Sequence, residues 1–299
     1  MLDWRRMDSS PPGPADQPAH KKGRLYLVAT PIGNLEDITV RALRLLGEVD
    51  LIACEDTRHT AKLLHHYGIN KPTISYHQHN EASRAGELLE RLEKGVDIAL
   101  VTDAGTPLVS DPGQRLVSLC LERHIPVSPI PGPSAVIAAL AASGLPAEEF
   151  VFVGFLPSRP NARRKVMGEL AHETRMLALY EAPHRLVDTL SDALQYLGRR
   201  QAVIAREMTK VHEEFLRGDL AELLVRVQQK PIRGEITLMI GPPSPGQQHD
   251  EQLSPSRLHE RVEQIMREQN VDRKAALKAA ARERGLTKRE AYKQFVSGG

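Results

Sequence analysis

Between residues 24 and 132, short apolar runs alternate with segments that have helical spacing. The apolar runs cover residues 25–29, 51–54, 73–76 and 97–101. They lack the period-two alternation of a half-exposed strand, which is typical of strands buried on both faces. The segments between them favour helices over 37–46, 57–67, 81–92 and 114–123, with Asn80 as an N-cap and Gly95 as a helix end. This pattern predicts a parallel sheet covered by helices.

A second set of apolar runs begins after residue 145. The runs cover 150–155, 176–180, 202–205 and 236–240, and helices are expected over 183–196 and 220–228. The segment 134–142 is apolar all round, so we expect a helix buried between layers. The chain therefore predicts a second α/β domain, with the boundary near 132–145.

The remaining segments differ in composition from these two domains. Residues 1–22 are rich in proline and poor in apolar groups, which favours disorder, and 244–255 have the composition of a linker. Residues 256–299 predict three short helices, with Asp272 capping the second, Gly285 ending it and a capping box at 287–290 opening the third. They resemble a helix-turn-helix unit. We expect domains over 23–133 and 134–243 and a helical appendage over 256–299.

Composition narrows the class of protein. A chain of 299 residues holds about two domains. The net charge of +2 does not by itself indicate a nucleic-acid binder. Cys54 and Cys120 form neither a disulfide framework nor a metal-ligand spacing, which favours a reducing compartment. No run is long enough to span a bilayer and no signal peptide is visible, so we expect a cytoplasmic protein.

The strongest functional signal is a pair of consecutive strand ends. Asp103-Ala104-Gly105-Thr106-Pro107 follows the run 97–101, and Pro131-Gly132-Pro133-Ser134-Ala135 follows the next strand. Ligands of open α/β sheets bind at the carboxyl ends of the strands. These two ends therefore predict a binding site.

Other strand ends allow two interpretations each. Thr30-Pro31-Ile32-Gly33-Asn34 is neither a dinucleotide fingerprint nor a phosphate loop, and is either a tight turn or a binding loop. Glu55 and Asp56 either begin a helix or face the same cleft as Asp103, where carboxylates position or deprotonate a hydroxyl. His77 and His79 have a metal-like spacing but no evident third ligand, so no metal is expected.

The second half offers further candidates. Glu181 is a cap or part of a site, Gly234-Glu235 suggests a close backbone approach, and Arg206 with Lys210 would suit phosphates. The basic run 158–165 is either a solvated helix face or an arm that grips a phosphate backbone. In the third C-terminal helix, Lys288, Arg289 and Lys293 suit phosphates more than base edges.

Taken together, these motifs resemble one family. The segments that carry the resemblance are 25–35, Glu55-Asp56-Thr57-Arg58, the Asp103 and Pro131 segments, and Tyr180-Glu181-Ala182-Pro183-His184-Arg185. They are similar to the cytidine-2′-O-methyltransferases of small-subunit ribosomal RNA, in the tetrapyrrole methylase superfamily, over about residues 24–296.

The resemblance implies two α/β domains with S-adenosylmethionine in the cleft between them, and a homodimer. It also implies methyl transfer to a cytidine 2′-hydroxyl in the decoding centre of 16S rRNA, within the small ribosomal subunit. The implied cofactor-binding residues are Pro31, Asp103, Ala104, Gly105, Thr106, Ser134, Ala135, Tyr180, Glu181, Ala205, Gly234, Glu235, Ile236 and Thr237. The expected RNA contacts are Arg58, Arg159, Arg163, Arg164, Lys165, Arg206, Lys210, Lys288, Arg289 and Lys293. The resemblance also implies that the helical appendage over 256–299 contacts RNA or the ribosome.

The proton of the ribose hydroxyl needs an acceptor, and Asp56, Glu55 and Asp103 are the candidates, in no fixed order. Two other functions remain open. One is a related methyltransferase acting on a tetrapyrrole or another small molecule, although a small substrate needs neither the basic arm nor the appendage. The other is a non-catalytic regulator whose C-terminal helices bind nucleic acid.

Overall fold

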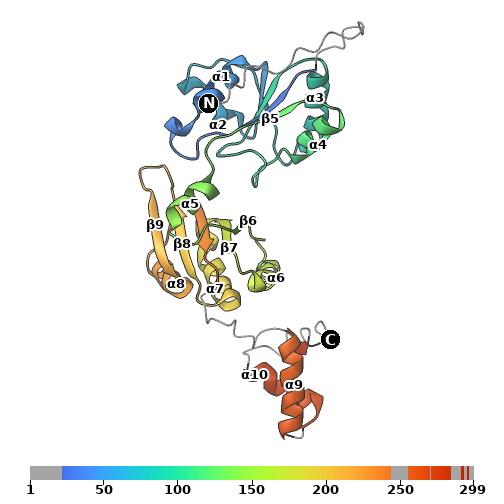
Figure 1. Cartoon of the computed structure of the whole chain (residues 1–299), viewed down its shortest axis with the longest axis vertical. Coiled ribbons are helices and arrows are strands. Elements are labelled where there is room, and N and C mark those ends of the chain that lie inside the picture. Colours follow the sequence, from blue (N-terminus) through green and yellow to red (C-terminus); the bar gives the residue numbers. More distant parts are fainter. Residues whose placement is uncertain (1–21, 244–254, 270, 284–290, 293–294, 296–299) are drawn as a thin grey trace, which may run out of the picture. The chain divides into compact units, whose positions relative to one another are not determined.

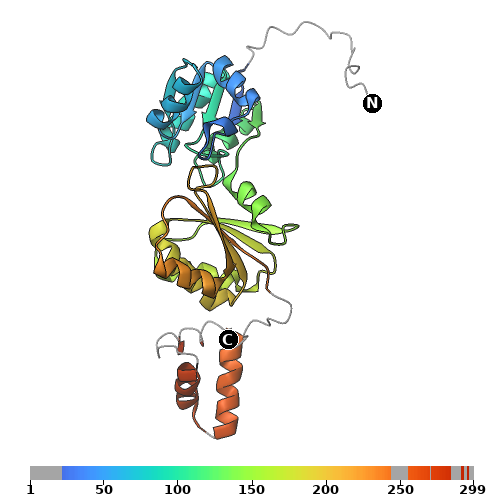
Figure 2. The same ribbon diagram turned by 90° about the vertical axis from the view of Figure 1, so that its left-hand side faces the viewer.

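In a computed structural model, the chain divides into two compact units, residues 1–135 and 136–299. The structure describes residues 22–243, 255–269, 271–283, 291–292 and 295. Several predictions fall outside these ranges. They concern the predicted disordered tail and the linker, of which only residues 22 and 255 are described, the capping box at 287–290 and the helix end at Gly285. Figures 1 and 2 show the elements of each unit in two views.

The first unit is built on a five-stranded parallel sheet with the strand order β3-β2-β4-β1-β5. Its strands are β1 (Leu25–Val28), β2 (Leu51–Cys54), β3 (Thr73–Ser75), β4 (Ile98–Val101) and β5 (Val127–Ile130). Its helices are η1 (Leu35–Asp37), α1 (Val40–Glu48), α2 (Thr57–His66), α3 (Glu81–Glu93) and α4 (Gln114–Glu122). Every residue of β2 and β4 is buried, as the unbroken apolar runs predict.

Helices cover both faces of this sheet. Leu88 and Leu116, from α3 and α4, pack in one hydrophobic cluster. Leu46 and Leu63, from α1 and α2, pack in another cluster on the opposite face. The sheet is thus the middle layer of three. The helices cover its two faces, so ligand-binding polar groups are expected at the ends of its strands.

The second unit contains a mixed sheet with the order β6-β7-β10-β8-β9. Its strands are β6 (Phe150–Phe155), β7 (Met176–Glu181), β8 (Gln201–Arg206), β9 (Glu214–Asp219) and β10 (Ile236–Ile240). Only β6 and β7 pair in parallel, and the other pairs are antiparallel. The helices are α5 (Ala135–Ser143), α6 (Pro160–Glu169), η2 (Leu170–His172), η3 (Pro183–Arg185), α7 (Leu186–Leu197) and α8 (Leu220–Gln229).

Helices α6, α7 and α8 pack against one face of this sheet around Met167, Leu190 and Leu223. Helix α5 differs from its prediction, because Ile137 is 52% exposed and only one side of the helix is buried. Arg217 of β9 holds the end of α5 by donating to the carbonyl oxygens of Ala142 (2.6 Å) and Ser143 (3.2 Å).

The C-terminal helices are α9 (Pro255–Gln269) and α10 (Arg273–Glu283). They share a small core in which Leu258, Val262 and Ile265 pack against Ala276 and Ala280. The Asp272 carboxylate accepts from the Ala275 N–H (2.7 Å), which confirms the predicted cap. Among the helices within the described ranges, none has both the length and the apolar composition that crossing a bilayer requires.

Candidate functional site

In the first unit, the loops that follow β1, β4 and β5 are tied together at the carboxyl edge of the sheet. Thr30 and Gly105 exchange two backbone hydrogen bonds of 2.9 and 3.0 Å. The Thr30 hydroxyl donates to the Thr102 carbonyl (3.0 Å), and the Thr106 hydroxyl donates to the Pro133 carbonyl (3.1 Å). The two strand ends singled out in the sequence are therefore neighbours in space.

Gly105 makes this arrangement possible. Its φ of +85° lies in a region that side-chain-bearing residues rarely adopt. The loop continues through Leu108 and Ser110, which have φ values of +73° and +69°. Non-glycine residues held at positive φ concentrate backbone strain, which is common at functional loops.

Carboxyl groups from the ends of β2 and β4 meet at the same edge. The Asp56 backbone N–H donates to Asp103 Oδ1 (3.1 Å), and the Thr102 hydroxyl donates to Glu55 Oε2 (3.4 Å). The Thr102 side chain also lies close enough to the carboxyl group of Asp111 to lower its pKa. Glu55, Asp103 and Asp111 thus form one group around Thr102, which we call the carboxyl cluster.

Burial gives Asp111 and Glu55 unusual proton affinity. It raises the pKa of Asp111 to about 6, and the nearby carboxyls of Glu55 and Asp103 act in the same direction. The pKa of Glu55 is also raised, first by burial and then by Asp103, while His77 opposes the rise. Among the described residues, no lysine or arginine forms an ion pair with the cluster. The negative charge of the cluster is therefore not neutralised by an ion pair with any lysine or arginine that the structure describes.

Asp56 has a different role from Glu55. Its Oδ1 accepts from the Arg58 backbone N–H (2.8 Å), which makes it the N-cap of α2. The Arg58 guanidinium holds the pKa of this carboxyl at about 2, so it accepts a proton poorly at neutral pH. The capping interpretation therefore fits Asp56, while Glu55 and Asp103 belong to the cluster.

Asp111 is the member that the sequence interpretation did not select. Asp111-Pro112-Gly113 is typical of a turn, and the burial that raises the pKa of Asp111 is not visible in the sequence. His77 lies close enough to act on Glu55. In the part of the chain that the structure describes, no set of three or more potential ligands is arranged to hold a metal ion.

In the second unit, three implied cofactor residues share one row of the sheet. Thr237 of β10 pairs with Tyr180 of β7 on one side and with Ala205 of β8 on the other. The Tyr180 ring contacts Phe152 and Phe155, with centroid distances of 5.1 and 5.5 Å. Strands distant in sequence therefore bring these positions side by side.

Gly234 and Glu235 precede this row and approach another strand end closely. Glu207 Oε1 accepts from the Glu235 N–H (3.0 Å), and a Cβ on Gly234 would fall 2.3 Å from that oxygen. Gly234 also has a φ of +89°. The positive φ favours glycine at this position, and the neighbour that approaches Gly234 is the Glu207 side chain rather than a backbone segment.

The Glu181 carboxylate is occupied inside the second unit. Its side chain is fully buried, accepts from the Thr189 hydroxyl (2.5 Å) and the Ala182 N–H (2.8 Å), and pairs with Arg185. The side chain therefore stabilises the end of β7, and only the backbone of Glu181 is left to contact a ligand.

Several predicted phosphate contacts are paired with carboxylates. Arg163 is 4% exposed and bonds Asp192 at 2.7 Å, so it faces the protein interior. Arg206 pairs with Glu214, and Lys210 with Glu207 and Glu235. The more exposed basic side chains are Arg58, Arg159, Arg164 and Lys165. Lys288, Arg289 and Lys293 lie outside the described residues.

Comparison with known proteins agrees with this architecture. The family model described as Tetrapyrrole (Corrin/Porphyrin) Methylases matches residues 24–224. A solved uroporphyrin-III C-methyltransferase from Thermus thermophilus, complexed with S-adenyl homocysteine, superposes with a TM-score of 0.52 at 22% identity, covering 73% of this chain and 97% of that one. At this identity the likeness establishes the fold, which confirms the predicted α/β architecture.

Closer relatives share one name, ribosomal RNA small subunit methyltransferase I. The protein from Synechocystis is 48% identical over 271 residues, covering 90% of this chain and 96% of the relative. The protein from Escherichia coli O157:H7 is 49% identical over 224 residues, covering 74% and 78%. The chain therefore belongs to the tetrapyrrole methylase family and, within it, to the ribosomal RNA small subunit methyltransferase I proteins.

Proposed function

We propose that this protein transfers a methyl group from S-adenosylmethionine to the ribose 2′-hydroxyl of a cytidine in the decoding centre of 16S rRNA. The observation that carries the RNA substrate is the 48% identity to a small-subunit rRNA methyltransferase over 90% of the chain. The solved methyltransferase of a porphyrin is only 22% identical. This contrast favours RNA over a tetrapyrrole as the substrate, and catalysis over a purely regulatory role.

The carboxyl edge of the first sheet suits the cofactor chemically. S-adenosylmethionine supplies an electrophilic methyl group on a positively charged sulfonium. The carboxyl cluster provides negative charge that no described lysine or arginine neutralises, so it favours a cationic ligand. Within the first unit, the residues that would hold the cofactor are Pro31, the loop 103–106, Ser134 and Ala135.

Glu55 is the best candidate to accept the proton of the hydroxyl. Its raised pKa makes it a stronger base than Asp56, whose pKa is about 2. Asp103 holds the two strand ends together through the Asp56 N–H. We assign Asp103 two roles at this edge, to position the strand ends and to supply negative charge beside the sulfonium.

The test is transfer of label from radioactive S-adenosylmethionine to small ribosomal subunits that lack the modification. The labelled position is then mapped by partial alkaline hydrolysis, because a 2′-O-methyl group blocks cleavage at its own phosphodiester. One protected cytidine in the decoding region is the expected result. Label on a base, or no label on RNA, would contradict the proposal. Subunits that already carry the modification serve as the control.

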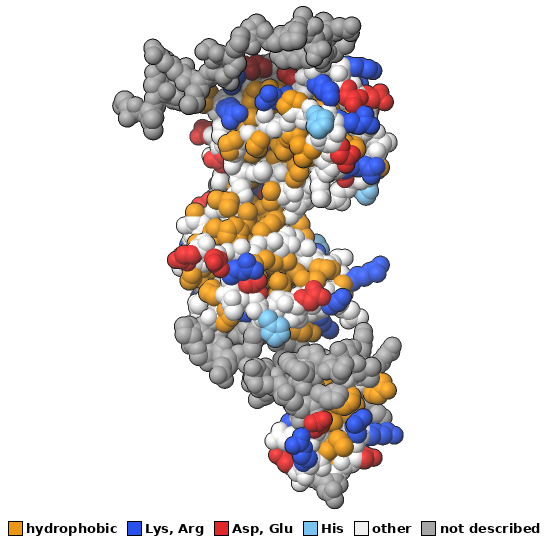
Figure 3. All heavy atoms as spheres, turned by 45° about the vertical axis from the view of Figure 1, so that its right-hand side comes forward, with side chains coloured by type: hydrophobic (Ala, Val, Ile, Leu, Met, Phe, Trp, Pro, Cys, Tyr) orange, Lys and Arg blue, Asp and Glu red, His pale blue; other side chains and the backbone are white. Residues whose placement is uncertain are grey.

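The family resemblance also leads us to expect a homodimer. Phe155 is 57% exposed beside the Tyr180 row, and Ile137 and Val211 are exposed too. Figure 3 shows hydrophobic side chains gathered on one face of the second unit. Exposed apolar surface of this kind supports an interface with a second copy.

A further inference from the structure

We infer that the C-terminal helices bind an unpaired RNA base in a groove beside α10, while lysine and arginine side chains at its rim take the flanking phosphates. This inference rests on the proposed RNA substrate. It identifies a site separate from the strand ends and names the form of RNA that the site would accept.

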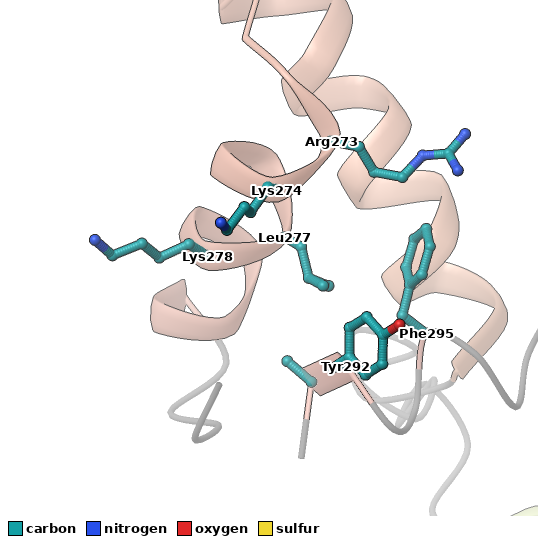
Figure 4. A pocket seen from close by; sticks show the side chains of 7 residues that line it. Arg273, Lys274, Leu277, Lys278, Tyr292 and Phe295 are labelled. Carbon is teal, nitrogen blue, oxygen red and sulfur yellow. The ribbon is translucent and has the colours of Figure 1, made fainter. Parts of the chain in front are cut away.

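The groove has a volume of about 670 Å³ and an almost wholly apolar surface. In Figure 4, Leu277 points from α10 toward the rings of Tyr292 and Phe295. The Tyr292 side chain is 64% exposed. An exposed aromatic ring at an apolar groove offers a face on which a base can stack.

Leu277 and Phe295 of this groove also pack against the core that holds α9 and α10 together, whereas its lysines do not belong to that core. The core uses Ala276 and Ala280, which lie one turn apart on one side of α10. Lys274 and Lys278 lie one turn apart on another side, and both are exposed. The lysines can therefore be changed without opening the core.

The two helices differ in how they neutralise their charges. On α9, Arg261 pairs with Glu268 and Arg267 pairs with Glu263. On α10, Arg273, Lys274 and Lys278 form no ion pair with any described residue. Figure 4 shows the two lysines extending to one side of α10 and Arg273 to the other.

Charge and shape together select the occupant. Cations that pair with no described carboxylate attract a polyanion, and the aromatic rings of the groove favour a flat apolar face. Single-stranded RNA offers both, because its bases are free to leave the stack, whereas a duplex keeps its base faces covered. An apolar peptide would fill the groove but would bring no negative charge to the three cations.

The experiment measures binding of the full-length protein to a fluorescein-labelled single-stranded RNA of about twelve nucleotides. The variants are Tyr292→Ala, Tyr292→Phe and the double change Lys274→Gln with Lys278→Gln. Lys62→Gln with Lys94→Gln, two exposed lysines of the first unit, is the matched charge control. Affinity is followed by fluorescence anisotropy over a range of KCl concentrations, with the duplex as a second probe.

We expect Tyr292→Ala to weaken single-strand binding by about 5- to 100-fold and Tyr292→Phe to bind like the unmodified protein. The double lysine change should weaken binding and lower the slope of log affinity against log salt by roughly 0.7 for each phosphate that the lysines no longer neutralise. Neither the lysine control nor duplex binding in Tyr292→Ala should change.

Unchanged single-strand affinity in Tyr292→Ala and in the double lysine variant, with unchanged thermal unfolding, would overturn the inference and indicate a protein segment as the occupant. Methyl transfer by the unmodified protein is measured in parallel. If the unmodified protein transfers no methyl group, only the proposed function is refuted, because RNA binding measured by anisotropy does not depend on methylation.

Discussion

At the scale of single residues, carboxyl groups of similar appearance in the sequence have separate roles in the structure. Asp56 caps a helix and has a pKa of about 2, whereas burial raises the pKa of Asp111 to about 6. The sequence shows which strand ends carry carboxylates. It does not show which of them become buried, because burial depends on loops that meet only in the folded chain.

We predict that Asp103→Asn lowers methyl transfer by about 100-fold or more, since the change removes a charge from the carboxyl edge. The amide oxygen of the variant can still accept from the Asp56 N–H, so the free energy of unfolding should change by less than about 1 kcal/mol. Single-turnover methylation and urea denaturation check the two parts. An unchanged single-turnover rate would show that Asp103 has no part in chemistry or binding.

Asp111 should make stability depend on pH. Its carboxyl keeps its proton up to a pH of about 6 in the folded protein but loses it near 3.9 when unfolded. The folded state therefore binds more protons between these values, and stability falls as pH rises through this window.

The change Asp111→Asn should abolish this decrease in stability with rising pH. The variant should be more stable than the unmodified protein at pH 8 by about 1–2 kcal/mol, and nearly equal to it at pH 4. The expected gain is below the full value of two pKa units, because solvent screens part of the interaction. Urea denaturation at pH 4, 6 and 8 gives the comparison, and parallel pH profiles for the two proteins would refute the assignment.

At the scale of elements, the sequence predicts the strands that are buried in the middle of a sheet but not the strand at the edge of the second sheet. The unbroken apolar runs located β2, β4 and β10 because central strands are buried on both faces. Strand β9 was missed, since Glu-Phe-Leu-Arg-Gly-Asp is mostly polar and lies at the edge of its sheet. Its hydrogen bonds to β8 are invisible in local composition.

Helix ends show the same division. Gly95 ends α3 at a φ of +92°, as predicted, and the Val96 N–H donates to the Arg91 carbonyl (3.1 Å). Asn80 occupies the N-cap position of α3, as predicted, but its side chain makes no cap hydrogen bond and instead accepts from the His77 N–H (2.9 Å). The hydrogen bond to the preceding loop therefore takes the place of the side-chain cap of the helix.

The packing of α6 on α7 should depend on one buried ion pair. Asp192→Ala would leave the Arg163 guanidinium buried with only a longer contact to Asp188 (3.5 Å), so we expect a loss of about 3 kcal/mol in unfolding free energy. Arg164→Gln removes a half-exposed partner of the same carboxylate and should cost less than about 1 kcal/mol. Thermal unfolding compares the two variants, and equal losses would contradict this role for Arg163.

At the scale of the whole molecule, a net charge of +2 gives little general attraction for RNA. Recognition must come from local surfaces, such as α10 and the exposed side chains near α6. The resemblance covers both sheets and the C-terminal helices, which is why the fold could be predicted so fully. The groove beside α10 could not, because its lining residues come together only when the helices pack.

Assembly can be tested on the intact protein. Sedimentation velocity should give a mass twice that of the 33.2-kDa chain at micromolar concentration. Exposed apolar side chains such as Phe155 explain why a second copy would bind. A single species with the mass of one chain would refute the homodimer.

The two cysteines of the chain have a practical consequence. Cys54 and Cys120 are fully buried and free, and burial raises the pKa of both thiols, that of Cys120 to about 11. Thiol reagents attack the thiolate, so the native protein should be nearly silent toward maleimides at neutral pH. The change Lys278→Cys, at an exposed position, would then supply the single reactive handle, ready for a fluorophore or a photo-crosslinker without first removing the natural cysteines.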